Sequence, residues 1–334
     1  MDHSEQNSLG GGYWYNIKAL LMILVVIGHF AQVFLWRDNT SGYYIVQGCV
    51  LFIYSFHMPL FVFISGYFSK DLEKRRKRAF YDLLRPYVMA QLALGILFFI
   101  LNHSFTVFRN ILIPSYGTWY LLALYIWRTM MPDIDKIKHN ILIAFCLNLF
   151  IVATDIDNTV AMGRTIGFLV FFLMGYYANE STIHTIRKIP IAIAGMGIFL
   201  ELCAWMLFSK MGVFNYTTIF SIFTHSYRSN NMDDILLGII NYSIAFVIAF
   251  INGILLIAIT PKKTVRYSNI GDNTLPLYIT HLLVVNIVYY TTINISNISY
   301  GIVASIAAIC CLLLFSTKWF KRKFIKLLGM QTMS

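Results

Sequence analysis

Apolar residues fall along the chain in long runs that are separated by short polar breaks. A run of about 20 apolar residues is long enough to cross a bilayer as a helix. Reading the chain for such runs, and accepting somewhat shorter ones, predicts ten spans. They lie near residues 14–35, 46–68, 87–104, 117–131, 140–154, 163–179, 189–208, 236–259, 274–291 and 299–317. The strands of a membrane barrel would instead alternate in polarity over about ten residues, and the chain has no such alternation. The pattern therefore predicts an all-α, polytopic integral membrane helical bundle.

The positions of the basic residues test this count. With the N-terminus inside, twenty of the 26 Lys and Arg residues fall in cytoplasmic loops or in the C-terminal tail. External loops hold only Arg37, Arg109, Lys210 and Arg228, and Lys18 and Arg164 lie within spans. This asymmetry is the one expected from the positive-inside rule. Ten spans with both termini in the cytoplasm are predicted, and the topology explains most of the net charge of +11.

Composition excludes several other classes of protein. Hydrophobic residues make up 58% of the chain and charged residues 12%, whereas a soluble domain has about 25% charged residues. A soluble globular, disordered or nucleic-acid-binding protein is therefore not expected. All five cysteines lie within apolar runs without metal-ligand spacing to a histidine, so we interpret them as small core residues and expect no metal site. The longest external loop, 209–235, contains an apolar piece from Gly212 to Phe223, interpreted as a re-entrant or interfacial segment.

A few ionisable residues lie inside the predicted spans. Such a group costs several kcal/mol unless it is paired or hydrated, so each is a functional hypothesis. They are Lys18, His29, His57, Arg164, Glu201 and His281. Lys18 and His29 are eleven residues apart, about three helical turns, so they share a face about 16 Å apart along the axis. The structural alternatives are that Lys18 extends to the membrane interface and that His29 hydrogen-bonds to another helix.

The second span carries His57 two residues before Pro59, followed by Ser65-Gly66. Pro59 removes a backbone donor and loosens the helix beside His57, while Ser65-Gly66 permits close approach of a second helix. A kink with a hydrogen-bonded histidine explains this almost as well. Histidine is, however, the usual general base near neutral pH, and three of them in one small bundle favour catalysis.

Arg164 and Glu201 lie toward the predicted outer side. A guanidinium there suits a sugar hydroxyl or a carboxylate, and the alternative is an ion pair with Asp155 or Asp157. Glu201 either binds substrate or pairs with a neighbouring helix.

The first inner loop, from Lys70 to Tyr87, is more basic than topology requires and includes Lys77, Arg78 and Arg85. One interpretation is contact with anionic lipids. The other is a binding site for a cytoplasmic cosubstrate that carries phosphate groups. The chain has no Walker loop or dinucleotide fingerprint, so ATP- and NAD-type sites are not indicated.

Seven short motifs follow one another along nearly the whole chain. They are Asn16-Ile17-Lys18 with ten residues before His29; Phe56-His57-Met58-Pro59-Leu60-Phe61; Ser65-Gly66-Tyr67; Leu84-Arg85-Pro86-Tyr87; Gly117-Thr118-Trp119-Tyr120-Leu121-Leu122; Arg164-Thr165-Ile166-Gly167-Phe168; and Asn273-Thr274-Leu275 with Leu277-Tyr278 and His281. Together they resemble the membrane acyltransferase family three, within its fucose 4-O-acetylase-like or capsular-polysaccharide O-acetyltransferase branch. Many members carry arginine where this chain has Lys18.

The resemblance implies one transmembrane acyltransferase domain over residues 1–334 of a multi-pass cell-membrane protein. It implies transfer of an acyl group, usually acetyl from acetyl-CoA, to a hydroxyl of a surface polysaccharide or its lipid-linked precursor. Under it, His29 acts as base or transient acetyl carrier, while His57 and His281 orient it, protonate the departing thiolate, or only hold helices together. The expected donor-binding residues are Lys18, Lys77, Arg78 and Arg85. The expected acceptor-binding residues are Arg164, Trp119 and Glu201.

Three other functions remain open from sequence. A glycan transporter would also line a path with intramembrane charges, although no corresponding broken helices are seen in the two halves. A related enzyme could use another donor, such as succinyl-CoA in poly-N-acetylglucosamine synthesis. A noncatalytic scaffold could bind other glycan-assembly proteins. All three, like the enzyme, would contact membrane lipids and no nucleic acid.

Overall fold

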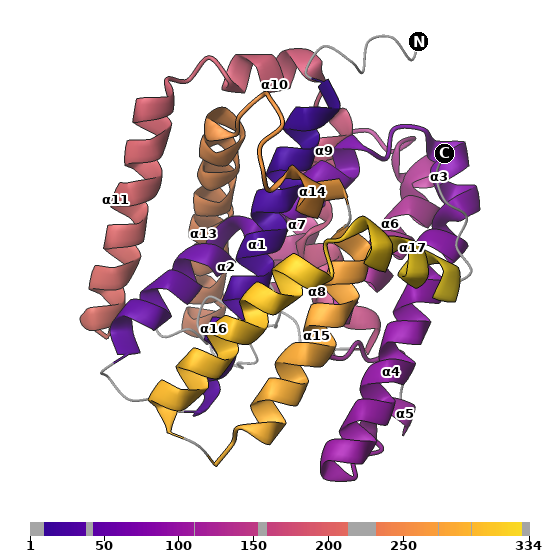
Figure 1. Ribbon diagram of the computed structural model, residues 1–334. Helices are drawn as coiled ribbons and strands as arrows, with labels where there is room; N and C mark the ends of the chain where they lie inside the picture. Colours follow the sequence, from indigo (N-terminus) through magenta and orange to yellow (C-terminus); the bar gives the residue numbers. More distant parts are fainter. Residues whose placement is uncertain are drawn as a thin grey trace.

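The computed structural model describes residues 10–37, 43–109, 111–152, 159–212, 232–272, 274–294 and 296–328 (Figure 1). Regular secondary structure in these ranges is helical throughout, without strands, as the apolar pattern predicted. The α-helices are α1 (Gly10–Arg37), α2 (Tyr44–Tyr67), α3 (Leu72–Ala79), α4 (Arg85–Asn102), α5 (Thr106–Arg109), α6 (Trp119–Ile134), α7 (Asn140–Val152), α8 (Met162–Gly167), α9 (Leu169–Tyr177), α10 (Glu180–Ile186), α11 (Ile191–Lys210), α13 (Met232–Ile259), α14 (Ser268–Asp272), α15 (Thr274–Thr291), α16 (Asn297–Leu314) and α17 (Lys318–Leu327).

Helices occupy each of the ten ranges predicted to be spans. Six are long and apolar enough to cross a membrane: Gly10–Leu35, Tyr44–Tyr67, Leu72–Asn102, Ile191–Lys210, Leu236–Ile259 and Thr274–Thr291. A seventh, formed by α16 and α17, is bent by 82°, and the apolar helices at Asn140–Phe150 and Met162–Tyr177 are shorter. The molecule is therefore a multi-pass helical membrane protein, while ten crossings and the orientation of the termini stay predictions.

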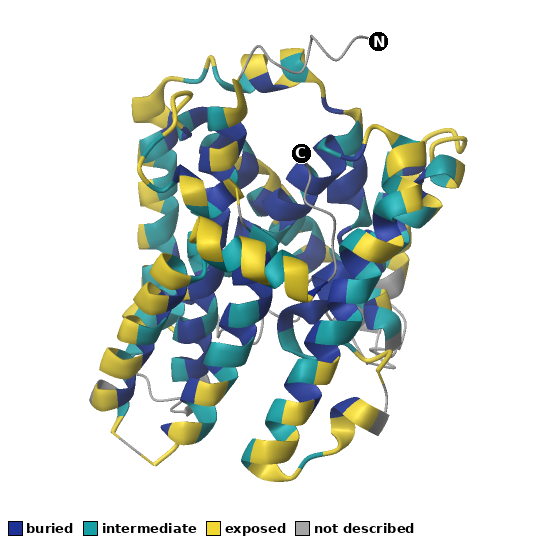
Figure 2. Ribbon diagram, turned by 45° about the vertical axis from the view of Figure 1, so that its right-hand side comes forward, coloured by how far each residue is buried: buried dark blue, intermediate teal, exposed yellow. Residues whose placement is uncertain are grey.

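The outward faces of the peripheral helices are apolar. In α11, Ile191, Phe199 and Leu200 are 69%, 62% and 61% exposed. Figure 2 shows exposed residues along the outer sides of the bundle. An apolar surface of this kind is expected to contact lipid.

This surface corrects the interpretation of the cysteines. Cys146, Cys203 and Cys310 are exposed, Cys49 is intermediate and only Cys311 is buried. In a membrane protein an apolar run faces lipid as readily as it faces the core, so an apolar environment in sequence does not place a cysteine inside.

Helix α2 packs against α1, α9, α11 and α13. The contact with α9 depends on two glycines: a Cβ at Gly66 would collide with the Phe172 carbonyl, and one at Gly175 with the Phe63 carbonyl. Small residues let membrane helices approach to backbone contact. The close approach predicted at Ser65-Gly66 is confirmed.

The helices α3, α10 and α14 gather at the end of the bundle where α1 begins (Figure 1). We call this the inner end, because the positive-inside pattern predicts it to be cytoplasmic. The predicted external segment from Gly212 to Phe223 lies almost entirely outside the described residues.

Candidate active site

Two of the three intramembrane histidines form a hydrogen-bonded pair. His29 Nδ1 on α1 lies 2.8 Å from His281 Nε2 on α15. The two rings are nearly parallel, at 7°, with centroids 5.1 Å apart. His281 is fully buried. Two residues that are 252 positions apart in the chain therefore make one site.

The backbone determines which ring nitrogens carry protons. His281 Nδ1 lies 3.0 Å from the Leu277 carbonyl, which only accepts hydrogen bonds, so this nitrogen carries a proton. In a neutral imidazole the other nitrogen then accepts, and His29 Nδ1 must be the donor to His281 Nε2. This assignment leaves His29 Nε2 with its lone pair. Within the described part of the chain it has no hydrogen-bond partner, so it is available as a base or nucleophile.

His57 stands beside this pair without joining it. Its Nδ1 donates to the Ile53 carbonyl at 2.7 Å. The ring of Tyr54 contacts both His57, at 4.7 Å between centroids, and His29, at 6.3 Å. Among the described residues no hydrogen bond connects His57 to His29 or His281. Its own geometry is that of a histidine satisfied by its helix.

Sequence reasoning missed the polar residues that surround His29. Gln32, one turn further along α1 and 2% exposed, accepts hydrogen bonds at Oε1 from Tyr54 at 2.7 Å and Tyr116 at 3.3 Å. The Tyr116 ring lies 4.8 Å from that of His29. The available signal was a glutamine inside an apolar run at i+3 from the histidine. Glutamine carries no charge, so the cost of burying an ionisable group does not single it out.

Arg164 and Trp119, the predicted acceptor-binding residues, contact each other. The guanidinium carbon lies 5.4 Å from the Trp119 ring, a cation–π contact, and Trp119 also stacks on Phe168 at 5.0 Å. Arg164 is close enough for its charge to act on His29 and Tyr54. The two aspartates proposed as alternative partners of Arg164 lie outside the described residues.

Glu201, the third predicted acceptor residue, lies in a polar cluster between helices. Its Oε1 accepts from Asn252 of α13 at 2.7 Å and from Trp205 of α11 at 3.1 Å. Asn252 also lies 3.4 Å from Ser55 of α2. This placement favours the interpretation that Glu201 joins helices, and contact with substrate stays a prediction.

A basic cavity of about 640 Å³ opens at the inner end between α1, α2, α3, α6, α14, α15 and α17. Six basic and two acidic side chains line it, together with the buried Ser65, Tyr120 and Tyr278. The basic residues are Lys18, Arg75, Arg78, Arg128, Lys321 and Arg322. We call it the inner cavity. Its charge suits an anionic ligand.

Two of the four predicted donor-binding residues line this cavity. Lys18 lies 4.8 Å from the Phe68 ring and 5.5 Å from the Tyr15 ring. Arg78 pairs with Asp82 at 3.3 Å. Arg75, which was not singled out, has an Nε atom that is shielded from solvent and has no hydrogen-bond partner in the described ranges. A buried guanidinium N–H of this kind is a ready donor to phosphate.

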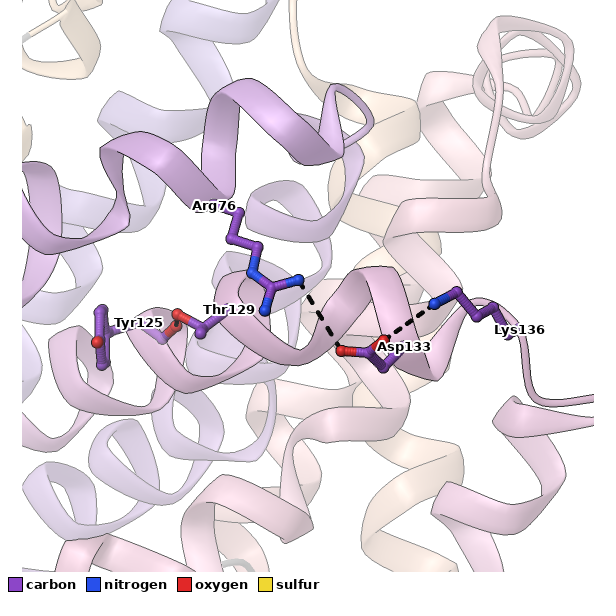
Figure 3. A network of polar contacts seen from close by, with 5 residues as sticks. All are labelled: Arg76, Tyr125, Thr129, Asp133 and Lys136. Carbon is purple, nitrogen blue, oxygen red and sulfur yellow. Dashed lines mark hydrogen bonds and ion pairs between the residues drawn. The ribbon is translucent and has the colours of Figure 1, made fainter.

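The other two predicted residues, Lys77 and Arg85, do not line the inner cavity. Lys77 is 78% exposed and pairs with Glu73 at 3.2 Å. The neighbouring Arg76 points toward Asp133 of α6, 3.9 Å away, and Lys136 approaches the same carboxylate at 3.1 Å (Figure 3). For Lys77 the reason is helical geometry: Arg75 and Arg78, three residues apart, share one face of α3, and the two residues between them point elsewhere.

A single aromatic residue connects the inner cavity to the histidine pair. Tyr278 lines the cavity, donates its hydroxyl to the Gly117 carbonyl, and contacts the His281 ring at 5.7 Å. Gly117 in turn lies against His29, because a Cβ there would be 3.5 Å from His29 Cε1. Tyr278 and Gly117 thus form a series of contacts from the inner cavity to the histidine pair.

The fold and this site define a multi-pass helical membrane protein with a buried histidine pair beside a basic cavity. The profile of a family described as Acyltransferase domain, the acyltransferase family three, matches residues 13–317. The chain belongs to this family of acyltransferases, as the seven motifs indicated. It is also similar to the nodulation protein NolL of Sinorhizobium fredii (strain NBRC 101917 / NGR234), with 45% identity over 53 residues. That alignment covers 16% of this chain and only 14% of NolL. No solved structure matches the chain.

Proposed function

We propose that this protein is an O-acetyltransferase of the cell membrane. It transfers an acetyl group from cytoplasmic acetyl-CoA to a sugar hydroxyl of a surface or capsular polysaccharide, or of its lipid-linked precursor. One observation carries the proposal: the pairing with His281 leaves the lone pair on His29 Nε2, and Tyr278, which contacts His281, also lines the inner cavity.

The inner cavity supports an acyl-CoA donor. Acyl-CoA carries a diphosphate and a 3′-phosphate at one end and a thioester at the end of its pantetheine arm. Lys18, Arg75 and Arg78 offer charged donors to the phosphates. The volume is within the range of about 300–1,000 Å³ typical of small-molecule sites. The arm would then extend along Tyr278 toward the histidine pair.

The surroundings of Arg164 support a glycan acceptor. Trp119 offers an aromatic ring and Arg164 a fork of N–H donors, a combination that suits the apolar face and the hydroxyls of a sugar. An acceptor on that side and a donor in the inner cavity would approach His29 from opposite directions.

The proposed chemistry is direct transfer with His29 as general base. His29 Nε2 takes the proton from the sugar hydroxyl as its oxygen attacks the thioester carbonyl carbon. The imidazolium that forms keeps its Nδ1–H bond to His281 Nε2, which becomes charge-assisted and therefore stronger. When the tetrahedral intermediate collapses, the carbon–sulfur bond breaks and His29 returns the proton to the thiolate. An acetyl-His29 intermediate is the alternative, and rapid-quench trapping of labelled protein would reveal it.

The experiment compares surface polysaccharide from cells with the intact gene, a deletion, and His29→Ala at matched protein level. Proton NMR before and after mild alkali counts base-labile acetyl groups. We expect acetyl signals to vanish in both the deletion and the variant. Base-labile succinyl groups in cells with the intact gene, in place of acetyl groups, would establish succinyl-CoA as the donor. Unchanged acetylation together with loss of polymer length or yield would favour the transporter.

A further inference from the structure

The C-terminal helix α17, with ten residues and five cations, is too short and too polar to cross a membrane by itself. It begins where α16 ends, turned by 82°, with Thr317 capping its first turn by accepting from the Phe320 N–H at 3.2 Å. Its sequence, KWFKRKFIKL, contains five cations, and none of its ten residues is buried. The helix crosses in front of the first turns of α15 and continues toward α3 (Figure 1).

One side of α17 forms part of the inner cavity. Lys321, Arg322, Phe324 and Ile325 all line it. Lys321 fixes the helix in place: its Nζ donates to the Asp272 carbonyl at 2.6 Å and to the Asp272 carboxylate at 3.0 Å. Asp272 ends α14, which packs closely on α1, the helix that carries Lys18 and His29. The C-terminal helix is thus tied to the same frame as the proposed catalytic residues.

Four of the five cations of α17, all except Lys318 in its first turn, fall into two sets. At 3.6 residues per turn, Lys321 and Arg322 flank Ile325 on the side that lines the cavity. Lys323 and Lys326 lie on the side turned away, together with Trp319 and Leu327, which are 68% and 72% exposed. Cations next to exposed Trp and Leu are typical of a helix that lies at a membrane interface. The positive-inside rule requires cations at the inner end but does not depend on which side of α17 carries them. It therefore does not explain why Lys321 and Arg322 face the cavity.

We propose that α17 is a phosphate-binding wall of the donor site, with Lys321 and Arg322 contacting the phosphate groups of acyl-CoA. This inference rests on the proposed function, because it takes acyl-CoA as the ligand of the inner cavity. Arg75 and Arg78 of α3 and Lys18 of α1 supply cations to the same cavity, so α17 completes a ring around the nucleotide end of the donor. Because both of its residues bind phosphate, they contribute to donor affinity and not to the chemical step.

The test measures binding to the full-length chain in nanodiscs of phosphatidylethanolamine and phosphatidylglycerol. The variant is Lys321→Gln with Arg322→Gln, and the matched control is Lys323→Gln with Lys326→Gln, which removes the same charge from the same helix. The ligands are CoA, and pantetheine as a competitor that lacks all phosphates. Melting temperature and gel-filtration profile confirm that each variant is folded.

We expect the Lys321/Arg322 variant to raise the Kd for CoA about tenfold, with a shallower dependence on salt, and the control to leave it within twofold. The inhibition constant of pantetheine should not change in either variant. An unchanged Kd for CoA in the first variant, or an equal loss for pantetheine, would overturn the inference while leaving the donor in place. If the native chain itself does not bind CoA, the proposed function fails, and the inference fails with it.

Discussion

The hydrogen bond between His29 and His281 determines which nitrogen of His29 keeps its lone pair. His281 Nε2 accepts a hydrogen bond from the Nδ1–H of His29. The lone pair of His29 is therefore on its Nε2, the nitrogen that would face the reactants. We predict that His281→Ala lowers kcat by about 10²–10⁴-fold, the usual range for loss of acid–base function, with a smaller effect on KM for acetyl-CoA. His281→Gln should recover part of the loss, because an amide oxygen can still accept the proton. Steady-state kinetics of the two variants test this, and equal losses in both would show that His281 only fills space.

The sequence predicts the members of this pair but not the pairing. Each histidine was selected because a polar group in an apolar run is costly, and that argument treats residues one at a time. The contact depends on how α1 and α15 pack, which a single sequence does not show. Gln32 is not predicted by that argument, because it carries no charge, although it is almost fully buried beside His29.

Helix α3 divides a run of basic residues between the inner cavity and the exposed surface. Arg75 and Arg78 line the inner cavity, whereas Lys77 pairs with an exposed glutamate. Surface pairs of that kind contribute at most about 1 kcal/mol. We predict that Arg75→Gln raises KM for acetyl-CoA at least fivefold with little change in kcat, whereas Lys77→Gln changes neither by more than twofold. Kinetics at fixed acceptor concentration measure both, and equal effects of the two substitutions would contradict the assignment.

The difference between Arg75 and Lys77 also marks a limit of the sequence. A basic loop predicts that cations lie at the inner end, but the choice among them depends on the rotation of α3. That rotation is set by Asp71, whose carboxylate accepts from the Lys74 N–H, and by packing on α6. Arg128 and the cations of α17 come from other parts of the chain, so no local pattern connects them to this loop.

The contact between α2 and α9 leaves no room for an added methyl group at either of its two glycines. A methyl group at Gly66 or Gly175 would collide with a backbone carbonyl of the opposite helix, which cannot yield as a flexible side chain would. We predict that Gly175→Ala lowers the free energy of unfolding by about 1–3 kcal/mol or more, as expected for overpacking. Gly195→Ala in α11 is the control, because nothing lies within 4 Å of its added Cβ. Thermal unfolding in detergent compares them, and equal melting temperatures would refute the close contact.

At the scale of the whole molecule, the lengths of the apolar runs predict where helices lie, whereas the charges of the loops predict their side of the membrane. The apolar runs place helices at all ten predicted ranges, yet α6 has 16 residues and α8 and α9 have 6 and 9. Short and broken helices of this kind are tolerated where they pack within protein. Two of these short helices contribute residues to the site: Trp119 begins α6 and Arg164 lies in α8. The length of a short helix alone does not show whether it crosses the membrane.

The position of the inner cavity gives a prediction about sidedness. Its cations come from α1, α3, α6 and α17. The first inner loop, which contains α3, accounts for much of the positive-inside signal. Under the proposed function, acetyl-CoA, which does not cross a bilayer, must be supplied from the side to which this cavity opens. Sealed inverted vesicles should therefore incorporate label from added acetyl-CoA, whereas right-side-out vesicles should do so only after permeabilisation. Trypsin cleavage at the exposed Lys74 and Lys77 reports the orientation independently, and should occur in inverted vesicles alone. Label incorporated by sealed right-side-out vesicles would place the donor on the opposite face, which would contradict both the predicted topology and a cytoplasmic donor.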